Sequence, residues 1–372
     1  MGHSVPAILL LLAGLRIVTP QSDQPVRGPR VIRVDPGELQ VQKVDFLVDQ
    51  ALIGSDDKPP FALLYDFGPG GRPHEIKVVA HLRRGASLER EIHPPPAPVP
   101  AARARAVVVD VAVYDRRGQL VDDLNPSDFA VFEDGEAQQV DFFALGSDDP
   151  RPLSVLLAID TSESMGEQLE LTSRAAREFI QALEPRDRIG LLTFNREVRL
   201  VGGLESTREE VLSALDRLEA YGDTALLRAL EEGSLLLREL PGRRVLVLFS
   251  DGIDTCSYGL SFDQVRRELL EAEVTVFPIG VQRWPDSGEA FLGRRQLVRL
   301  ARETGGREQF LSRRAQIGAA LDQVSLGLAS RYMLSYRPPE GSAASWHELS
   351  INVARPELKV IAKPGYFERS AR

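Results

Sequence analysis

The chain has 372 residues, which is enough for about two or three domains of roughly 100–200 residues each. Hydrophobic residues make up 43% of it, so a sizeable folded core is expected and general disorder is not. The net charge of −9 argues against a general nucleic-acid-binding protein, since such proteins usually carry basic domains. A single cysteine, Cys256, excludes an intrachain disulfide and is compatible with a reducing or an oxidising compartment.

The N-terminal segment contains an apolar run from Pro6 to Leu15. This run is too short for the roughly 20 residues that span a bilayer, but it has the length of a signal-peptide core. We predict an export signal in residues 1–20. A buried strand or helix and a membrane anchor are the alternatives, because no Lys or Arg precedes the run and no clear cleavage site follows it. Any membrane association would depend on this segment.

Residues 28–93 consist of short alternating segments separated by turn-forming clusters such as Asp35-Pro36-Gly37. Strands of this length, with turns every 8–12 residues or so, are typical of a small β-sandwich. The stretch VDFLVDQALIGSDDKPPFALLYDFG resembles bacterial immunoglobulin-like modules, which implies a spacer domain. The Pro- and Ala-rich residues 94–104 are predicted to form a stiff linker.

Two further segments, 105–149 and 331–372, also have the pattern of β-structure. In the first, Glu133-Asp134-Gly135-Glu136 predicts a hairpin turn, because Asp-Gly favours positive φ angles. The second contains only about three short strands, which are marginally stable alone. We therefore expect the C-terminal strands to pack beside residues 105–149.

Between these segments, residues 150–330 alternate buried strands with amphipathic helices. This alternation predicts an α/β fold: a doubly wound, mostly parallel, Rossmann-like sheet with helices on both faces. The predicted strands are 155–160, 188–195, 245–251 and 274–281, with an edge strand at 198–203. The predicted helices are 167–183, 207–219, 225–239, 261–272, 290–304 and 314–329. Thr207, Asp223 and Ser261 are interpreted as N-caps or residues just before helices.

Polar side chains follow the first buried strand at alternate positions: Asp160, Ser162 and Ser164. One carboxylate and two hydroxyls with this spacing can direct oxygen atoms at one point, an arrangement that suits Mg²⁺ better than Zn²⁺. Two later loops contain Thr224, at the start of a helix, and Asp251, at the end of a strand. Because the carboxyl ends of parallel strands share one edge of the sheet, we expect the three loops to lie together.

This ordered set of loops resembles the von Willebrand factor type A (VWFA) domain, in which the same loops form a metal-ion-dependent adhesion site (MIDAS). The resemblance covers about 180 residues, with the motif filled by Asp160, Ser162, Ser164, Thr224 and Asp251. It implies that the three hydroxyls bind Mg²⁺ (or Mn²⁺ or Ca²⁺) directly and that the two carboxylates act chiefly through waters or hydrogen bonds. The flanking stretches VVVDVAVYDRRGQLVDDLNPSDFAVFEDG and RYMLSYRPP are similar to a bacterial secreted group with a VWFA-related domain. A secreted, periplasmic or cell-surface bacterial protein is therefore expected.

The function expected from this resemblance is non-enzymatic protein binding. A partner would supply an Asp or Glu carboxylate that completes the coordination of the ion, with no nucleic acid and no small-molecule cofactor involved. The alternatives are a metal-dependent hydrolase or phosphoryl-transfer enzyme that uses Asp160, or a structural envelope protein with a vestigial site. The sequence has no P-loop, and no histidine lies between residues 94 and 346, which excludes a Ser-His-Asp triad within the α/β region.

Overall fold

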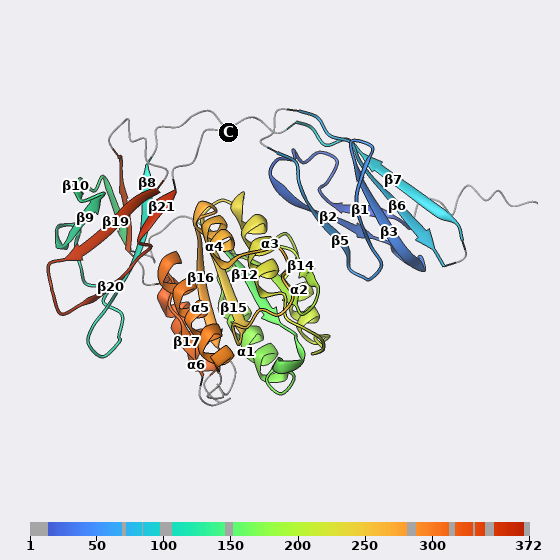
Figure 1. Cartoon of the computed structure of the whole chain (residues 1–372). Helices are drawn as coiled ribbons and strands as arrows, with labels where there is room; N and C mark the ends of the chain where they lie inside the picture. Colours follow the sequence, from blue (N-terminus) through green and yellow to red (C-terminus); the bar gives the residue numbers. More distant parts are fainter. Residues whose placement is uncertain are drawn as a thin grey trace, which may run out of the picture. The chain divides into compact units, whose positions relative to one another are not determined.

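The computed structural model describes residues 14–68, 72–83, 85–96, 106–145, 152–280, 288–311, 317–329, 332–338 and 346–367. The chain forms two compact units, residues 1–102 and residues 103–371 (Figure 1). Most of the predicted linker, from residue 97 onward, lies outside the described residues, as do residues 1–13 of the predicted export signal. Among the helices that the structure describes, none has the length and apolar character needed to cross a membrane.

The N-terminal unit is built from two antiparallel sheets with strand orders β1-β2-β5 and β4-β3-β6-β7. Its strands are β1 (Arg16–Thr19), β2 (Pro29–Asp35), β3 (Val41–Val48), β4 (Ala51–Asp56), β5 (Phe61–Asp66), β6 (Ile76–Leu82) and β7 (Ser87–Ile92). Alternate side chains of these strands enclose one apolar core, so the two sheets form a sandwich. The label immunoglobulin-like stays a prediction.

The first strand of this sandwich begins earlier than the expected boundary at residue 28. Residues Arg16–Thr19 pair antiparallel with β2, and the Leu15 side chain is buried in the core. A four-residue strand is too short to show a clear alternating pattern, which is why the sequence did not separate it from the apolar run before it. The segment from residue 14 to residue 20 is therefore part of the folded unit.

The second unit contains a small sandwich made from both ends of its sequence. Its sheets have the orders β10-β9-β19-β21 and β11-β18-β8-β20 (Figure 1). The strands are β8 (Val107–Tyr114), β9 (Phe129–Glu133), β10 (Glu136–Gln138), β11 (Phe142–Leu145), β18 (Tyr332–Tyr336), β19 (Trp346–Val353), β20 (Lys359–Ile361) and β21 (Gly365–Phe367). C-terminal strands thus pair with strands that precede the α/β region, as the instability of three isolated strands suggested.

The α/β region is a six-stranded sheet with the order β14-β13-β12-β15-β16-β17, and the predicted fold class is confirmed. All neighbouring strands are parallel except the edge strand β14, which is antiparallel to β13. The strands are β12 (Leu153–Asp160), β13 (Arg188–Phe194), β14 (Val198–Gly202), β15 (Arg243–Ser250), β16 (Val274–Gly280) and β17 (Gln309–Phe310). Every side chain of β12 is buried, because helices cover both faces of the sheet.

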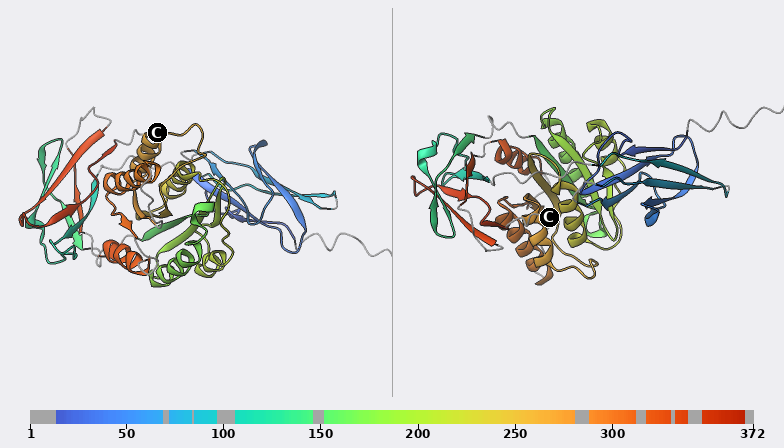
Figure 2. Two further views of the ribbon diagram at one scale, coloured as in Figure 1. Left: turned by 60° about the horizontal axis from the view of Figure 1, so that its bottom comes forward. Right: turned by 90° about the horizontal axis from the view of Figure 1, so that it is seen from above.

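Helices cover both faces of the sheet (Figure 2). The helices are α1 (Leu169–Ala182), α2 (Arg208–Leu215), α3 (Leu226–Arg238), α4 (Phe262–Glu271), α5 (Gly288–Thr304) and α6 (Ile317–Ala329). Helices α1, α2 and α6 share one core with Val155, Leu157 and Ile159. Helix α3 lies on the opposite face, where Gly233 allows it to approach Leu246 closely. The alternation of β12 side chains between two faces thus places helices on both sides.

Local capping chemistry sets where several helices begin. Thr207 accepts a hydrogen bond from the Glu210 amide in a capping box, and Ser261 caps α4 in the same way, so both are confirmed as N-caps. Asp223 is not an N-cap, since α3 begins after Ala225 and the Asp223 carboxylate instead lies 3.1 Å from the Arg196 guanidinium. Its position before the helix was predicted correctly, but its partner comes from another loop.

Candidate metal centre

The three predicted loops meet at the carboxyl edge of the sheet because their strands are neighbours in register. Ile159 in β12 is paired with Phe249 in β15, and Asp160 with Phe194 in β13. Asp160 follows Ile159, and Ser250 and Asp251 follow Phe249. The first and third loops therefore begin side by side at the ends of β12 and β15. The expectation that these loops lie together is met for the first and third loops by direct side-chain contact.

Side-chain oxygens of the first and third loops form a short chain of contacts. The hydroxyl oxygens of Ser162 and Ser164 are 3.1 Å apart, and the Ser164 hydroxyl donates to Asp251 Oδ2 at 3.0 Å. The Asp160 carboxylate accepts a hydrogen bond from the Ser162 amide at 2.9 Å, which fixes the turn that follows β12. A 3₁₀ turn at Glu163–Met165 then presents Ser164 toward the same point.

The second loop is held at this edge by hydrogen bonds to both other loops, and those to the third loop are made by Thr224. The Thr224 amide donates to Thr255 Oγ1 at 2.8 Å, and its carbonyl accepts from the Cys256 amide at 3.1 Å in the segment after Asp251. On the other side, the Gly222 carbonyl accepts from the Glu163 amide at 3.0 Å. The second loop is therefore hydrogen-bonded to both the first and the third.

Burial leaves one opening to the candidate centre. Asp160, Ser162, Thr224 and Asp251 are each at most 5% exposed, whereas Ser164 is exposed. The pKa of Asp160 is raised to about 7, chiefly because the carboxyl is buried. Hydrogen bonds from Ser162 and Ser250 oppose this rise, and the negative charge of Asp251 adds to it. Two carboxylates thus lie near each other in a poorly hydrated place, where a cation would be favourable.

The donor set has the chemistry and the spacing that a hard divalent cation requires. All five predicted side chains offer oxygen, and neither nitrogen nor sulfur is among them. Neighbouring ligands of an octahedral ion with metal–oxygen distances of about 2.0–2.1 Å are separated by about 2.9 Å. The measured separations of 3.1 Å between the two serine hydroxyls and 3.0 Å from Ser164 to Asp251 are close to this value. The residues present therefore fit Mg²⁺ or a similar ion.

Two residues support the centre in ways that the sequence did not predict. Ser250 is fully buried, donates to Asp160 Oδ2 at 2.8 Å and accepts from the Gly252 amide at 3.0 Å, so it joins the first and third loops. Asp254 accepts from the Leu227 amide at 3.0 Å and so caps helix α3 from the third loop. The adjacency of Ser250 to Asp251 at a strand end was the only available signal for its role.

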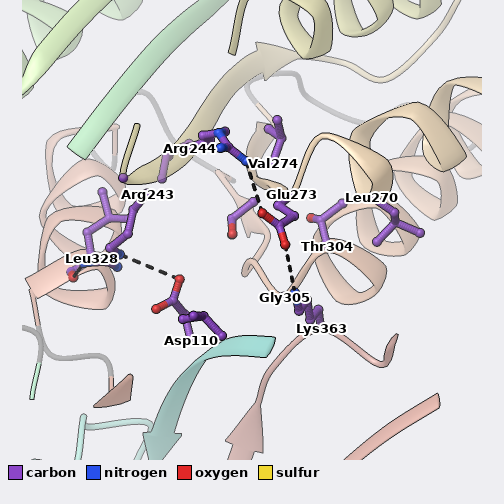
Figure 3. A pocket seen from close by; sticks show the side chains of 14 residues that line it. Asp110, Arg243, Arg244, Leu270, Glu273, Val274, Thr304, Gly305, Leu328 and Lys363 are labelled. Carbon is purple, nitrogen blue, oxygen red and sulfur yellow. Dashed lines mark hydrogen bonds and ion pairs between the residues drawn. The ribbon is translucent and has the colours of Figure 1, made fainter. Parts of the chain in front are cut away.

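A separate cavity lies at the opposite, amino ends of the strands (Figure 3). It measures about 70 Å³, well below the roughly 300 Å³ of small-molecule sites. Its charged side chains face each other: Asp110 lies 3.9 Å from Arg243, and Glu273 lies 3.2 Å from Arg244 and 4.0 Å from Lys363. This cavity therefore belongs to the packing of the small sandwich against the α/β sheet.

Comparison with known proteins identifies the α/β region. The family model of the von Willebrand factor type A domain matches residues 155–253. Inter-alpha-trypsin inhibitor heavy chain H2 of Sus scrofa is 28% identical over 159 residues, which cover 38% of this chain and 17% of the pig protein. The chain thus corresponds to only a small part of that relative's length.

Two solved structures that match this chain do so at low identity. A von Willebrand factor type A protein from Catenulispora acidiphila shares 12% identity, with a TM-score of 0.43 and coverage of 72% of this chain and 76% of that chain. Proximal thread matrix protein 1 from the mussel byssus, with a zinc-occupied MIDAS motif, shares 18% identity, with a TM-score of 0.43 and coverage of 54% and 50%. The family match, together with the confirmed sheet and its helices, shows that this chain contains a von Willebrand factor type A domain.

Proposed function

We propose that the α/β domain is a metal-dependent protein-binding module that captures an acidic residue of a partner. Asp160, Ser162, Ser164, Thr224 and Asp251 would hold the ion, which is Mg²⁺ in our proposal, with Mn²⁺ or Ca²⁺ as substitutes. The observation that carries the proposal is the chain of oxygens from Ser162 through Ser164 to Asp251 at 3.0–3.1 Å, with Ser164 exposed at its opening. VWFA domains in general mediate protein–protein interactions, and this chain contains one.

The five residues divide into those that would bind the ion directly and those that orient the direct ligands. The neutral hydroxyls of Ser162, Ser164 and Thr224 would bind the ion directly, so little of its charge would be cancelled by them. Asp160 and Asp251 orient these groups, since Asp160 fixes the Ser162 amide and Asp251 accepts from the Ser164 hydroxyl. When bound, the ion supplies a positive centre that attracts an external carboxylate. Ser164 is the only exposed member of the set and would therefore contact that carboxylate first.

Metal binding can be tested by thermal unfolding of the full chain with Mg²⁺, Mn²⁺, Ca²⁺ and Zn²⁺ in turn. At a concentration 100 times Kd, one bound ion stabilises the folded state by about 2.7 kcal/mol, which corresponds to a Tm rise of roughly 5–10 °C. We expect this rise in the wild type and its loss in Asp160→Ala.

The matched control is Asp263→Ala, which removes an exposed carboxylate of α4 that pairs with Arg299 and with none of the five predicted residues. It should keep the full metal response. A wild type whose Tm is the same with and without each ion would contradict the metal site, and would favour a structural protein with a vestigial site. Phosphatase or esterase turnover that disappears in Asp160→Ala would contradict the non-enzymatic assignment.

Export remains part of the proposal. We infer that the N-terminal apolar segment directs the chain to the periplasm, the cell surface or the medium of a bacterium, where a binding module can meet its partner. Expression of the full chain in a bacterial host, followed by fractionation and mass determination, tests this. Because Leu15 and β1 belong to the folded unit, a cleavage site after residue 20 would remove a strand. The mass of the exported chain therefore also shows whether β1 is retained.

A further inference from the structure

The large apolar side chains that the α/β domain exposes are concentrated around the candidate metal centre. Within residues 152–280, 288–311 and 317–329, which the structure describes, they are Tyr221, Tyr258, Phe291 and Leu292, with exposures of 51%, 85%, 62% and 56%. Single exposed apolar residues are ordinary on protein surfaces, but several gathered at one place mark an interaction surface.

Each of the four residues lies in or next to a segment whose backbone contacts one of the loops of the centre. The Tyr221 amide donates to the Thr161 carbonyl at 2.9 Å, next to the first loop. Tyr258 follows directly on the segment whose Cys256 amide donates to Thr224.

Phe291 and Leu292 precede Gly293, the point where α5 touches the third loop. A Cβ atom on Gly293 would lie 2.8 Å from the Asp251 carbonyl oxygen, so the helix backbone rests directly on the loop that contains Asp251. The two side chains are exposed at the start of that helix. The four residues therefore lie on three separate segments that contact the loops of the centre, and we call them the apolar collar.

We propose that the apolar collar binds large apolar side chains that flank the acidic residue of a partner, so that the recognised segment is one carboxylate between hydrophobic residues. This inference rests on the proposed function and adds the chemical class of the partner. Aromatic side chains are well suited to such contacts, because they bury a large area at a low cost in conformational entropy.

Charges beside the collar favour the same partner. Arg295 lies with its guanidinium 5.8 Å from the Phe291 ring and is exposed, so a negatively charged segment is attracted to this edge. Glu163, exposed in the first loop, opposes a second carboxylate next to the one that would meet the ion. A single acid with apolar neighbours satisfies both conditions better than a run of acidic residues does.

The test is a selection of random displayed peptides on the immobilised full chain, in Mg²⁺ and in EDTA. The best peptide is then synthesised beside a version whose flanking residues are serine, and both are measured by fluorescence anisotropy. We expect selected peptides to carry an Asp or Glu between large apolar residues. The serine-flanked version should bind about tenfold more weakly, which corresponds to about 1.4 kcal/mol.

Substitutions then assign the preference to the collar. In Tyr258→Ser/Phe291→Ser the tenfold difference should fall to about twofold, while the metal-induced rise in Tm is kept. Phe142→Ser is the matched control, because Phe142 is 49% exposed in β11 of the small sandwich. It should leave the tenfold difference unchanged.

The outcomes separate the two proposals. Peptides with a metal-dependent acid but no apolar flanks would overturn the collar and leave the proposed function intact. A selection with no metal-dependent acid would overturn both. An equal loss of preference in Phe142→Ser and in the collar variant would also refute the collar, since it would show general surface adhesion. If the double variant fails to fold, Tyr258→Ser alone, at a side chain that is 85% exposed, makes the same comparison.

Discussion

Ser250 offers the sharpest test of how the candidate centre is built. Its hydroxyl donates to Asp160 Oδ2 at 2.8 Å and accepts from the Gly252 amide at 3.0 Å, while its side chain is completely buried. Ser250→Ala removes both contacts and leaves a carboxylate oxygen and an amide without these partners. We expect a loss of stability and a weaker affinity for metal, because the first and third loops are no longer joined through this hydroxyl.

The magnitude follows from the two lost hydrogen bonds. A hydrogen bond to a charged group contributes about 1.5–3 kcal/mol, and a buried amide left without an acceptor costs about 1–3 kcal/mol. The two effects share one hydroxyl and overlap, so we expect a decrease of about 3 kcal/mol in the free energy of unfolding, or roughly 6–12 °C in Tm. Loss of such a supporting contact typically lowers metal affinity about 10–100-fold.

Ser154→Ala is the matched control for this experiment. Ser154 lies in the neighbouring strand β12 and is also fully buried, and its hydroxyl has no hydrogen-bond partner among the residues that the structure describes. The same chemical change should therefore alter stability by less than about 0.5 kcal/mol, or increase it, since an unsatisfied buried hydroxyl is unfavourable. Urea unfolding in EDTA, followed by metal titration, measures both quantities. Equal destabilisation by the two substitutions would refute the role given to Ser250.

Three further predictions concern other parts of the second unit. Gly252→Ala should destabilise the second unit by about 2–4 kcal/mol in urea unfolding, because φ is +81° and the added Cβ would lie 2.6 Å from the Gly293 carbonyl oxygen. In the control Gly259→Ala φ is +83° but no atom lies within 4 Å of the added Cβ, so the loss should be only about 1–2 kcal/mol. Burial raises the pKa of Glu232 to about 7, so the folded state binds its proton more tightly than the unfolded state does. The free energy of unfolding should therefore fall as the pH rises from about 4.5 to about 7. This pH dependence should be weaker in Glu232→Gln, and an unchanged dependence would contradict the assignment. Replacement of residues 146–331 by a two-residue Asn-Gly turn should leave a sandwich with a cooperative urea transition, because Leu145 and Tyr332 are paired in antiparallel neighbours; a chain without such a transition would contradict its independence.

The α/β domain was predictable because its local and tertiary signals agree. Strand β12 reads as a continuous apolar run, and the structure buries all of its side chains. Helix α2 begins where the capping box at Thr207 indicates, and the hairpin turn at Asp134-Gly135 has the positive φ angles that its sequence favours. In each case the residue type alone restricts the backbone to the observed conformation.

The remaining features depend on contacts between distant segments, which no local pattern specifies. The direction of the Ser250 hydroxyl is set by Asp160, which is 90 residues away in the sequence. Asp254 caps α3 from a loop that follows the helix, whereas the residues next to Thr224 in the sequence predict a cap at Asp223. The packing of the C-terminal strands was expected from their instability alone, but their register against β8 and β11 required the structure.

The small sandwich is joined to the α/β domain at the edge of the sheet opposite the candidate centre. The chain leaves the sandwich at β11 and returns at β18, two hydrogen-bonded neighbours, so the α/β domain is inserted between adjacent strands. The sandwich meets that domain at the amino ends of β15 and β16, where Asp110 faces Arg243 and Lys363 faces Glu273 (Figure 3). Parallel strands that start at this interface end at the opposite edge, where Asp251 lies. The α/β domain is therefore attached to the sandwich at the amino edge of its sheet. The carboxyl edge, which contains Asp160 and Asp251, is not covered by the sandwich.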